Sequence, residues 1–490
     1  MNGSNLITSQ RAQIARPWVV IGALALLLAS TSIAAGPSAA NAAAKKSFKP
    51  VRKTHRALVF KPRGVRAQGV REASIRLRVG GRKGKTTVQR VSRGRIRNAL
   101  RRGRRVTFRK PRKTGGGRLV IRSAQQSDPR GAEPVFGCEA EAFGGSDLPG
   151  SCWRPFDSSS AFNKPIPTNP TLLTDSNGDS SAEMVEQMLT HASGKTDAIT
   201  VNPGGSWDYN HPYYFARPSD PLVTVKLSTN WDGGHVSERK IRIPAMARPA
   251  AGGDAHITIV QSEDDPAVSA DVRGYVVGLY DTQARPAGGW IDGGTIAAKS
   301  GGRSHLSTGS GVDLGNSTAA SFNNLAGIIR APELLDGQIN HAIFAATNCT
   351  TGKAVSPAPG GTAVVCGSSR YSQLSADAKM PPLGARLQLD PSYDISRFPA
   401  GQRAILRALQ VYGALIGDTG AYSRKVMFGI GVESGETYTS LGYRDQLAQF
   451  AQQAINEGWA SKGTNNGTTA YWLEFGKGVD WSRLRVVAPY

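Results

Sequence analysis

The stretch Gly252-Gly253-Asp254-Ala255-His256-Ile257-Thr258-Ile259-Val260 decides the fold that we expect for this chain. From Asp254 onward, polar and apolar residues alternate strictly, which is typical of a β-strand with one face against a core. The polar face carries Asp254, His256 and Thr258, spaced roughly 7 Å apart at the rise of a strand. A carboxylate this close to an imidazole favours the charged ring. We therefore predict Asp254 and His256 as catalytic residues.

Short β-prone runs continue on both sides of this stretch, separated by loops rich in Gly and Ser. This spacing is typical of β-sandwiches. The expected strands are residues 222–227, 239–243, 256–260, 275–281, 326–330, 341–347 and 385–389. Apolar residues then recur with helical spacing over residues 399–416 and 443–457, as they do in an earlier short segment, 182–189. Residues 138–490 are thus predicted to form a mainly-β body, sandwich-like or jelly-roll-like, with two C-terminal helices.

The first 42 residues have the pattern of a secretory signal peptide. Arg11 and Arg16 precede an apolar run over residues 18–29, and Ala40-Asn41-Ala42 is typical of a cleavage site. A membrane anchor is the alternative, but the apolar run is shorter than the ~20 residues of a transmembrane helix. We therefore expect a secreted protein without a transmembrane segment after removal of the signal.

Four cysteines agree with export, because disulfides persist in oxidising compartments. Cys138 lies close to Cys152 in the sequence, and Cys349 lies close to Cys366. We expect these two local pairs, although four cysteines allow three connectivities. A zinc site is the alternative, and neither pair has the two-residue spacing that such sites use.

Positive charge is concentrated near the N-terminus. Residues 45–125 hold 29 Lys and Arg against one acid, Glu72, whereas residues 126–490 hold 29 basic and 35 acidic residues. A disordered basic arm is one interpretation. We favour a small folded β-module over residues 45–122, followed by a linker over residues 123–137. Its β-prone runs are residues 57–60, 75–79, 87–91, 105–108 and 119–121.

A module this basic is expected to bind a polyanion. For an exported protein, that partner would be a polysaccharide or an anionic cell-wall polymer, such as a teichoic or uronic-acid polymer. The aromatic pattern of RNA-recognition strands is missing from the sequence, so we expect no specific nucleic-acid partner.

The densest aromatic cluster occupies residues 207–215. Rings interleaved with polar residues suit a platform on which sugars stack, although burial in a core is the commoner fate of such rings. The long loop over residues 287–317 could line a cleft. The predicted substrate-binding residues are Trp207, Tyr209, His211, Tyr213, Tyr214 and Asp292.

Several fragments in combination resemble a group of uncharacterised secreted bacterial proteins. They are the Asp-x-His stretch at 254–256, Gly327–Arg330, Ile339–Ala342, Pro381–Leu387, Asp394–Ser396, Tyr412-Gly413 and Asp418–Gly420. The resemblance covers residues ~150–430 and implies a β-rich secreted fold without an established activity. Members often carry an Arg-His pair before the Pro-Pro segment, whereas this chain reads Arg370-Tyr371. Jelly-roll alginate lyases offer a fold-level analogy only, through Gln338–His341.

The candidate catalytic residues suit three kinds of chemistry. Paired carboxylates, with Glu333 and Asp292 near Asp254, suit glycoside hydrolysis. If His341 lies beside His256, a His or Tyr base suits β-elimination from a uronate, with Arg330 and Arg386 to neutralise the carboxylate. The same His and Asp side chains could instead bind a divalent cation. A strand histidine is, however, often only a hydrogen-bonded part of the structure.

Two functions follow from these observations. The first is a secreted carbohydrate-active enzyme, a hydrolase or a lyase, that acts on an envelope or extracellular polysaccharide. The second is a non-catalytic protein of the cell surface that binds polysaccharide with the same β-sandwich. The sequence lacks the nucleophile elbow, the phosphate-binding loop, the zinc-protease helix and the dinucleotide fingerprint, which excludes the commonest enzyme classes built on them.

Overall fold

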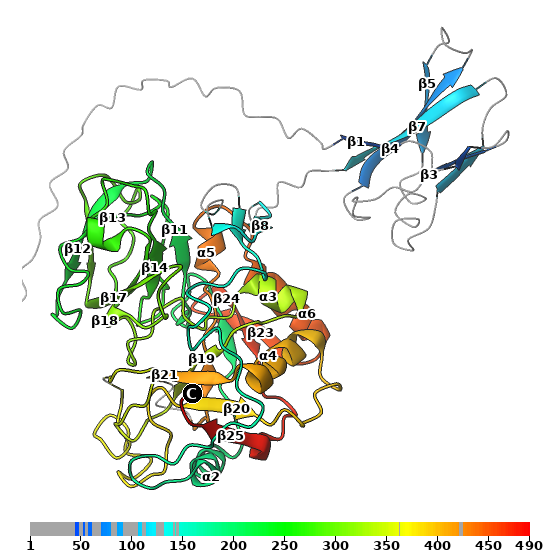
Figure 1. Cartoon of the computed structure of the whole chain (residues 1–490). Coiled ribbons are helices and arrows are strands. Elements are labelled where there is room, and N and C mark those ends of the chain that lie inside the picture. The colour runs from blue at the N-terminus through cyan, green and yellow to red at the C-terminus, as the bar shows by residue number, and fades with distance from the viewer. Residues whose placement is uncertain are drawn as a thin grey trace, which may run out of the picture. The chain divides into compact units, whose positions relative to one another are not determined.

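The computed structural model describes the chain from Ala132 to Tyr490, except for residues 141–142, 144–146, 362 and 421–424, and the backbone of strands between residues 45 and 123. The chain divides into two compact units, residues 1–126 and 127–490 (Figure 1), and each is described by itself. The predicted signal peptide and residues 124–131 of the predicted linker lie outside the described residues.

The described part of the first unit consists of antiparallel strands. One sheet has the order β1-β7-β4-β5 and the other the order β2-β3-β6. The strands are β1 Lys45–Phe48, β2 Arg52–Lys53, β3 Ala57–Phe60, β4 Val70–Val79, β5 Thr86–Val91, β6 Val106–Arg109 and β7 Thr114–Ser123. The five β-prone runs predicted for the basic module lie within β3, β4, β5, β6 and β7, except that Arg105, the first residue of one run, lies outside the described residues.

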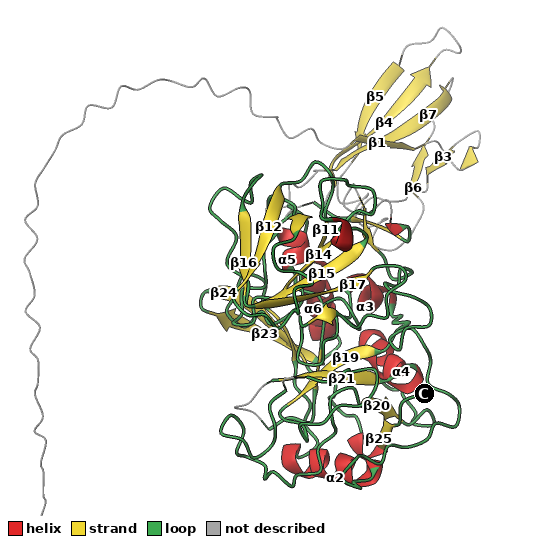
Figure 2. Ribbon diagram, turned by 60° about the vertical axis from the view of Figure 1, so that its left-hand side comes forward, coloured by secondary structure: helices red, strands yellow, loops and turns green. Residues whose placement is uncertain are grey.

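The second unit is mainly β, as predicted, and one of its sheets has five strands in the order β11-β14-β15-β17-β18. A smaller sheet of order β13-β12-β16 lies beside it (Figure 2), and side chains of both sheets fill one hydrophobic core. The strands are β11 Tyr213–Phe215, β12 Leu222–Leu227, β13 Lys240–Arg242, β14 Ile257–Val260, β15 Tyr275–Tyr280, β16 Thr295–Ala298, β17 Ser300–His305 and β18 Leu314–Gly315. Two pairs, β11 with β14 and β12 with β16, are parallel.

A second five-stranded sheet, of order β22-β19-β21-β20-β25, packs with helices around a larger core. Its strands are β19 Ile343–Thr347, β20 Arg386–Leu389, β21 Ala414–Thr419, β22 Gly429–Ile430 and β25 Leu484–Val487. The remaining strands are β8 Val135–Gly137, β9 Asp147–Pro149, β10 Ile199–Val201, β23 Ala460–Asn465 and β24 Thr468–Leu473. The α-helices are α2 Ser181–Ala192, α3 Ala331–Asp336, α4 Ala400–Val411, α5 Glu436–Thr439 and α6 Gln446–Asn456.

The predicted C-terminal helices both form, but the first ends earlier than expected. Helix α4 stops at Val411 because Gly413 has a φ of +74° and a Cβ there would lie 2.6 Å from the carbonyl oxygen of Leu387. Leu415 and Ile416, assigned to the helix by their spacing, belong to β21 instead. The predicted strand over residues 326–330 also does not form; Ile329 makes only an isolated bridge to Val432.

The segment of residues 252–260 is a strand only from Ile257 onward. Asp254 and Ala255 lie in the preceding turn, where the amide of Ala255 donates to the carbonyl of Gly252 at 3.0 Å. All four residues of β14 are buried because each face of the strand meets a different core. The expected row of polar side chains on one strand face is therefore wrong: Thr258 is buried in the strand, and Asp254 is oriented by the preceding turn.

We expect Ile257→Ala to lower the free energy of unfolding by about 2–4 kcal/mol, because Ile257 is fully buried among the side chains of two sheets. Chemical denaturation of both proteins measures the difference. Ile291→Ala is the matched control, since Ile291 is 69 % exposed and should contribute little. Equal losses in the two variants would contradict this assignment of the core.

Both predicted disulfides are confirmed. Cys138 pairs with Cys152 and Cys349 pairs with Cys366, with Cα atoms 5.5 and 5.1 Å apart. None of the described helices is long and apolar enough to cross a membrane. Disulfides fit an extracellular protein, and secretion itself stays a prediction.

Candidate functional site

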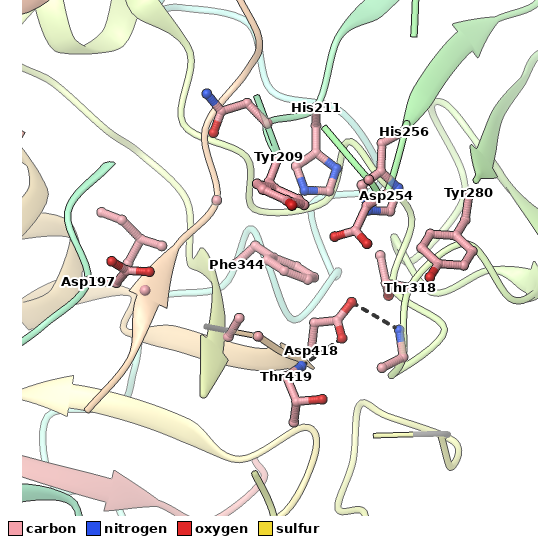
Figure 3. Close-up of a pocket in the computed structure, with 18 of the residues that line it drawn as sticks. Asp197, Tyr209, His211, Asp254, His256, Tyr280, Thr318, Phe344, Asp418 and Thr419 are labelled. Carbon is pink, nitrogen blue, oxygen red and sulfur yellow. Dashed lines mark hydrogen bonds between the residues drawn. The ribbon is translucent and has the colours of Figure 1, made fainter. Parts of the chain in front are cut away.

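A cavity of about 1300 Å³ opens in the second unit, and segments far apart in the sequence line it (Figure 3). The turn before β14 contributes Asp254 and His256, and the end of β21 contributes Asp418. Phe344 of β19 and Tyr280 of β15 complete the part of the wall near these residues. This part of the wall therefore combines two carboxylates with an imidazole, and a third carboxylate, that of Asp197, lines another part of the cavity.

The position of Asp418 depends on a bulge in β21. Ala345 pairs with Ile416 and Ala346 pairs with Asp418, so Gly417 is the extra residue. A bulge redirects the side chains that follow it. Only glycine fits there, because a Cβ at Gly417 would lie 2.2 Å from the ring of Phe344. The bulge separates Asp418 from the buried Ile416 and turns its carboxyl toward the cavity.

The charge of Asp254 acts on the carboxyl of Asp418 in the cavity. Figure 3 shows the side chains of Asp254 and Asp418 facing the same space. Burial, followed by the charge of Asp254, raises the pKa of Asp418 to about 7, although its oxygens accept from the amides of Thr419 at 2.6 Å and Ala319 at 3.5 Å. Asp418 is therefore largely protonated below neutral pH and can donate a proton.

Two histidines stack at the same end of the cavity. The rings of His211 and His256 lie 4.6 Å apart at 21°, and the ring of Tyr280 lies 5.5 Å from that of His256. Burial lowers the pKa of both histidines, and for His256 it outweighs the opposing charge of Asp254. The charged imidazole that we expected beside Asp254 is therefore wrong: both rings are neutral at neutral pH. Their Nδ1 atoms have no hydrogen-bond partner within the described structure.

Exposed aromatic rings also line the cavity. Trp207, Tyr209 and Trp231 are 46, 51 and 48 % exposed, and Trp472 of β24 meets Trp207 edge to face at 5.8 Å. Rings with one free face are the usual surface for stacking a sugar. Of the rings predicted to form a sugar-stacking platform, Trp207 and Tyr209 therefore lie at the cavity.

The other rings of the predicted platform lie deeper. Tyr213 and Tyr214 are fully buried in β11, where the hydroxyl of Tyr214 donates to the carbonyl of Arg248 at 2.8 Å. These two rings follow the core interpretation. Asp292 does not line the cavity; its carboxylate accepts from the amide of Leu222 at 2.8 Å.

The remaining predicted catalytic residues lie away from the cavity in two buried groups. In the first, Arg330 donates to Glu333 at 2.6 Å, and His341 lies 3.1 Å from the same carboxylate oxygen. In the second, Arg386 donates to the carbonyls of Tyr412 and Ala161 at 2.6 and 2.7 Å. Both arginines donate to groups of the protein itself. His341 lies against Glu333 outside the cavity, so the predicted meeting of His341 with His256 does not occur.

Several residues of the cavity escaped the sequence analysis as site residues. They include Asp197, Asp418, Tyr280, Lys299, Trp231, Arg370 and Trp472. Asp418 stood in a fragment noted only for its resemblance, and no local pattern marks the others as site residues. Among the described residues, no group of three or more His, Cys, Asp or Glu side chains is arranged to hold a metal ion.

No family model, curated protein or solved structure matches this chain. The residues that line the cavity are therefore what indicates a function.

Proposed function

We propose that the protein is carbohydrate-active and that its cavity binds and hydrolyses a stretch of polysaccharide. The observation that carries the proposal is the pair Asp254 and Asp418 facing one cavity, with the pKa of Asp418 raised to about 7. Glycoside hydrolysis requires one protonated carboxyl and one carboxylate on opposite sides of the scissile bond. The exposed rings of Trp207 and Tyr209 would hold the sugars on either side of that bond.

Each carboxyl has one role in this reaction. Asp418 gives its proton to the glycosidic oxygen as the bond from the anomeric carbon to that oxygen breaks. Asp254 supplies the carboxylate, which either attacks the anomeric carbon or deprotonates a water molecule that attacks it. If Asp254 has attacked, water then cleaves the glycosyl ester and returns a proton to Asp418; if Asp254 acts as the base, it takes the proton of the attacking water. In both routes water provides the hydroxyl of the new reducing end, and no other reactant is needed.

The groups predicted for β-elimination do not assemble in the cavity, although two other cations, Lys299 and Arg370, line it. Elimination from a uronate needs a base together with a positive group that neutralises the sugar carboxylate. Arg330 and Arg386, the groups expected for that task, are buried away from the cavity and donate to protein acceptors. The neutral histidines at the cavity end pack on each other.

A panel of extracellular and cell-wall polysaccharides tests the proposal. We expect the full chain to release new reducing ends from at least one polymer, without ultraviolet absorbance from unsaturated products. Products that absorb in the ultraviolet would replace hydrolysis with elimination. Binding without any products would favour the non-catalytic alternative, and the lack of both binding and products would overturn the proposal.

The basic first unit is proposed to attach the protein to an anionic polymer of the envelope. Residues 45–125 hold 29 Lys and Arg against one acid, so we expect binding of the full chain to polyuronate or teichoic acid to fall steeply with salt through loss of counterion release. Affinity measured at ~50 and ~200 mM salt checks this. Deletion of residues 45–122 should remove most of the salt dependence, and an unchanged salt slope would place the polyanion site elsewhere.

A further inference from the structure

A lysine stands between two aromatic rings in the cavity wall. Lys299 joins β16 to β17, and its ammonium lies 5.5 Å from the ring centre of Trp231 and 5.9 Å from that of Tyr280. All three side chains line the cavity. The backbone of Lys299 is fixed, because its amide donates to the carbonyl of Tyr280 at 3.0 Å and its carbonyl accepts from the hydroxyl of Thr229 at 2.8 Å. The lysine is therefore presented by a rigid part of the sheet.

The charge of Lys299 is not matched by an acid. Within the part of the chain that the structure describes, no Asp or Glu forms an ion pair with its ammonium, whereas Lys226 pairs with Glu238 and Lys379 pairs with Glu183. The rings beneath the ammonium supply only a weak cation–π attraction. Its three donors therefore remain available to a ligand that enters the cavity.

We propose that Lys299 and Trp231 form a subsite for a sugar residue that carries an anionic group. The sugar ring stacks on the half-exposed Trp231 while its carboxylate or phosphate pairs with the Lys299 ammonium. This rests on the proposed function and names its substrate class, an acidic glycan. The carboxylate of Asp254 would repel an anion at its own position, so the anionic group is directed to the lysine. The basic first unit requires the same kind of polymer.

The test compares matched charged and neutral ligands on the full chain. The probes are hexagalacturonate, its fully methyl-esterified form and a glycerol phosphate oligomer, with affinity measured by calorimetry at constant salt. We expect Lys299→Met to weaken hexagalacturonate or glycerol phosphate binding roughly tenfold, the effect of losing one charged hydrogen bond, and to leave the ester unchanged. Lys299→Arg should restore most of the affinity.

Lys462→Met is the matched control. Lys462 also lies over an aromatic ring, 5.6 Å from that of Tyr471, but it does not line the cavity, and its replacement removes the same net charge. Equal losses for the two Met variants would overturn the subsite. The subsite would also be overturned if the methyl ester bound as tightly as hexagalacturonate and Lys299→Met had no effect. That result would leave the proposed function standing. If the wild-type protein bound no glycan of the panel, both the subsite and the proposed function would be overturned.

Discussion

We expect Asp418→Asn to slow hydrolysis of a polysaccharide substrate by roughly 10²- to 10⁴-fold at pH 6, the range contributed by a general acid. Asp418 is protonated there because burial and the charge of Asp254 raise its pKa to about 7. Asparagine keeps the shape and the acceptor for the amide of Thr419, but it cannot release a proton to the leaving oxygen. Initial rates of reducing-end formation by both proteins measure the effect.

The pH dependence separates this role from a structural one. Wild-type activity should fall as the pH rises through about 7, because Asp418 then loses the proton that it must donate. The Asn variant should lack this limb. A carboxyl whose pKa is higher in the folded than in the unfolded protein lowers stability as the pH rises from about 4 to its folded value. The variant should therefore be at least as stable as the wild type at pH 8.

Asp445→Asn provides the control for this prediction. Asp445 is also a buried carboxyl, with a pKa raised to about 6, but it caps helix α6 through the amide of Ala448 and does not line the cavity. Asparagine serves as a helix cap nearly as well as aspartate. Activity should survive in this variant. If Asp418→Asn retained full activity with its alkaline limb, the proton donor would have to be sought elsewhere.

Much of the fold could be predicted from local pattern. Strand β12 coincides with the predicted residues 222–227, and helix α6 lies within the predicted 443–457, because alternation and helical spacing reflect burial on one face. Sequence patterns gave wrong predictions where a strand is buried on both faces, as in β14, and where one glycine ends a helix. Leu415 and Ile416 continue the helical spacing of α4, yet the close approach of Gly413 to Leu387 ends the helix before them.

The candidate site could be predicted only in part. Four of the predicted residues line the cavity because two short segments carry them: one holds Trp207 and Tyr209, and the other holds Asp254 and His256. Asp418 reaches it through the parallel pairing of β21 with β19 and through the bulge at Gly417, and neither feature leaves a mark in a single sequence. The sequence indicated that Arg330, Glu333 and His341 could act together. It could not tell whether they form an active site or a buried ion pair, because both use the same residue types.

We expect Glu333→Gln to lower the free energy of unfolding by about 3–5 kcal/mol, the cost of leaving a buried charge without its partner. Glu333 and Arg330 are both buried and joined at 2.6 Å. The guanidinium also donates to the carbonyls of Gly150 and Trp153, which bind it but do not neutralise it. Chemical denaturation at pH 7 measures the loss. Glu238→Gln is the matched control, because Glu238 pairs with Lys226 at the surface and should contribute within about 1 kcal/mol.

The pH dependence of the same variant identifies the cause. Burial opposes ionisation of Glu333, but the charges of Arg330 and His341 outweigh it and lower the pKa of the carboxyl. A lowered pKa adds stability above the unfolded value and loses it as the pH falls through the folded value. The gap between wild type and variant should therefore narrow below about pH 4. A gap that is small at pH 7, together with abolished glycan cleavage, would move the active site from the Asp254–Asp418 cavity to the Arg330–Glu333–His341 group.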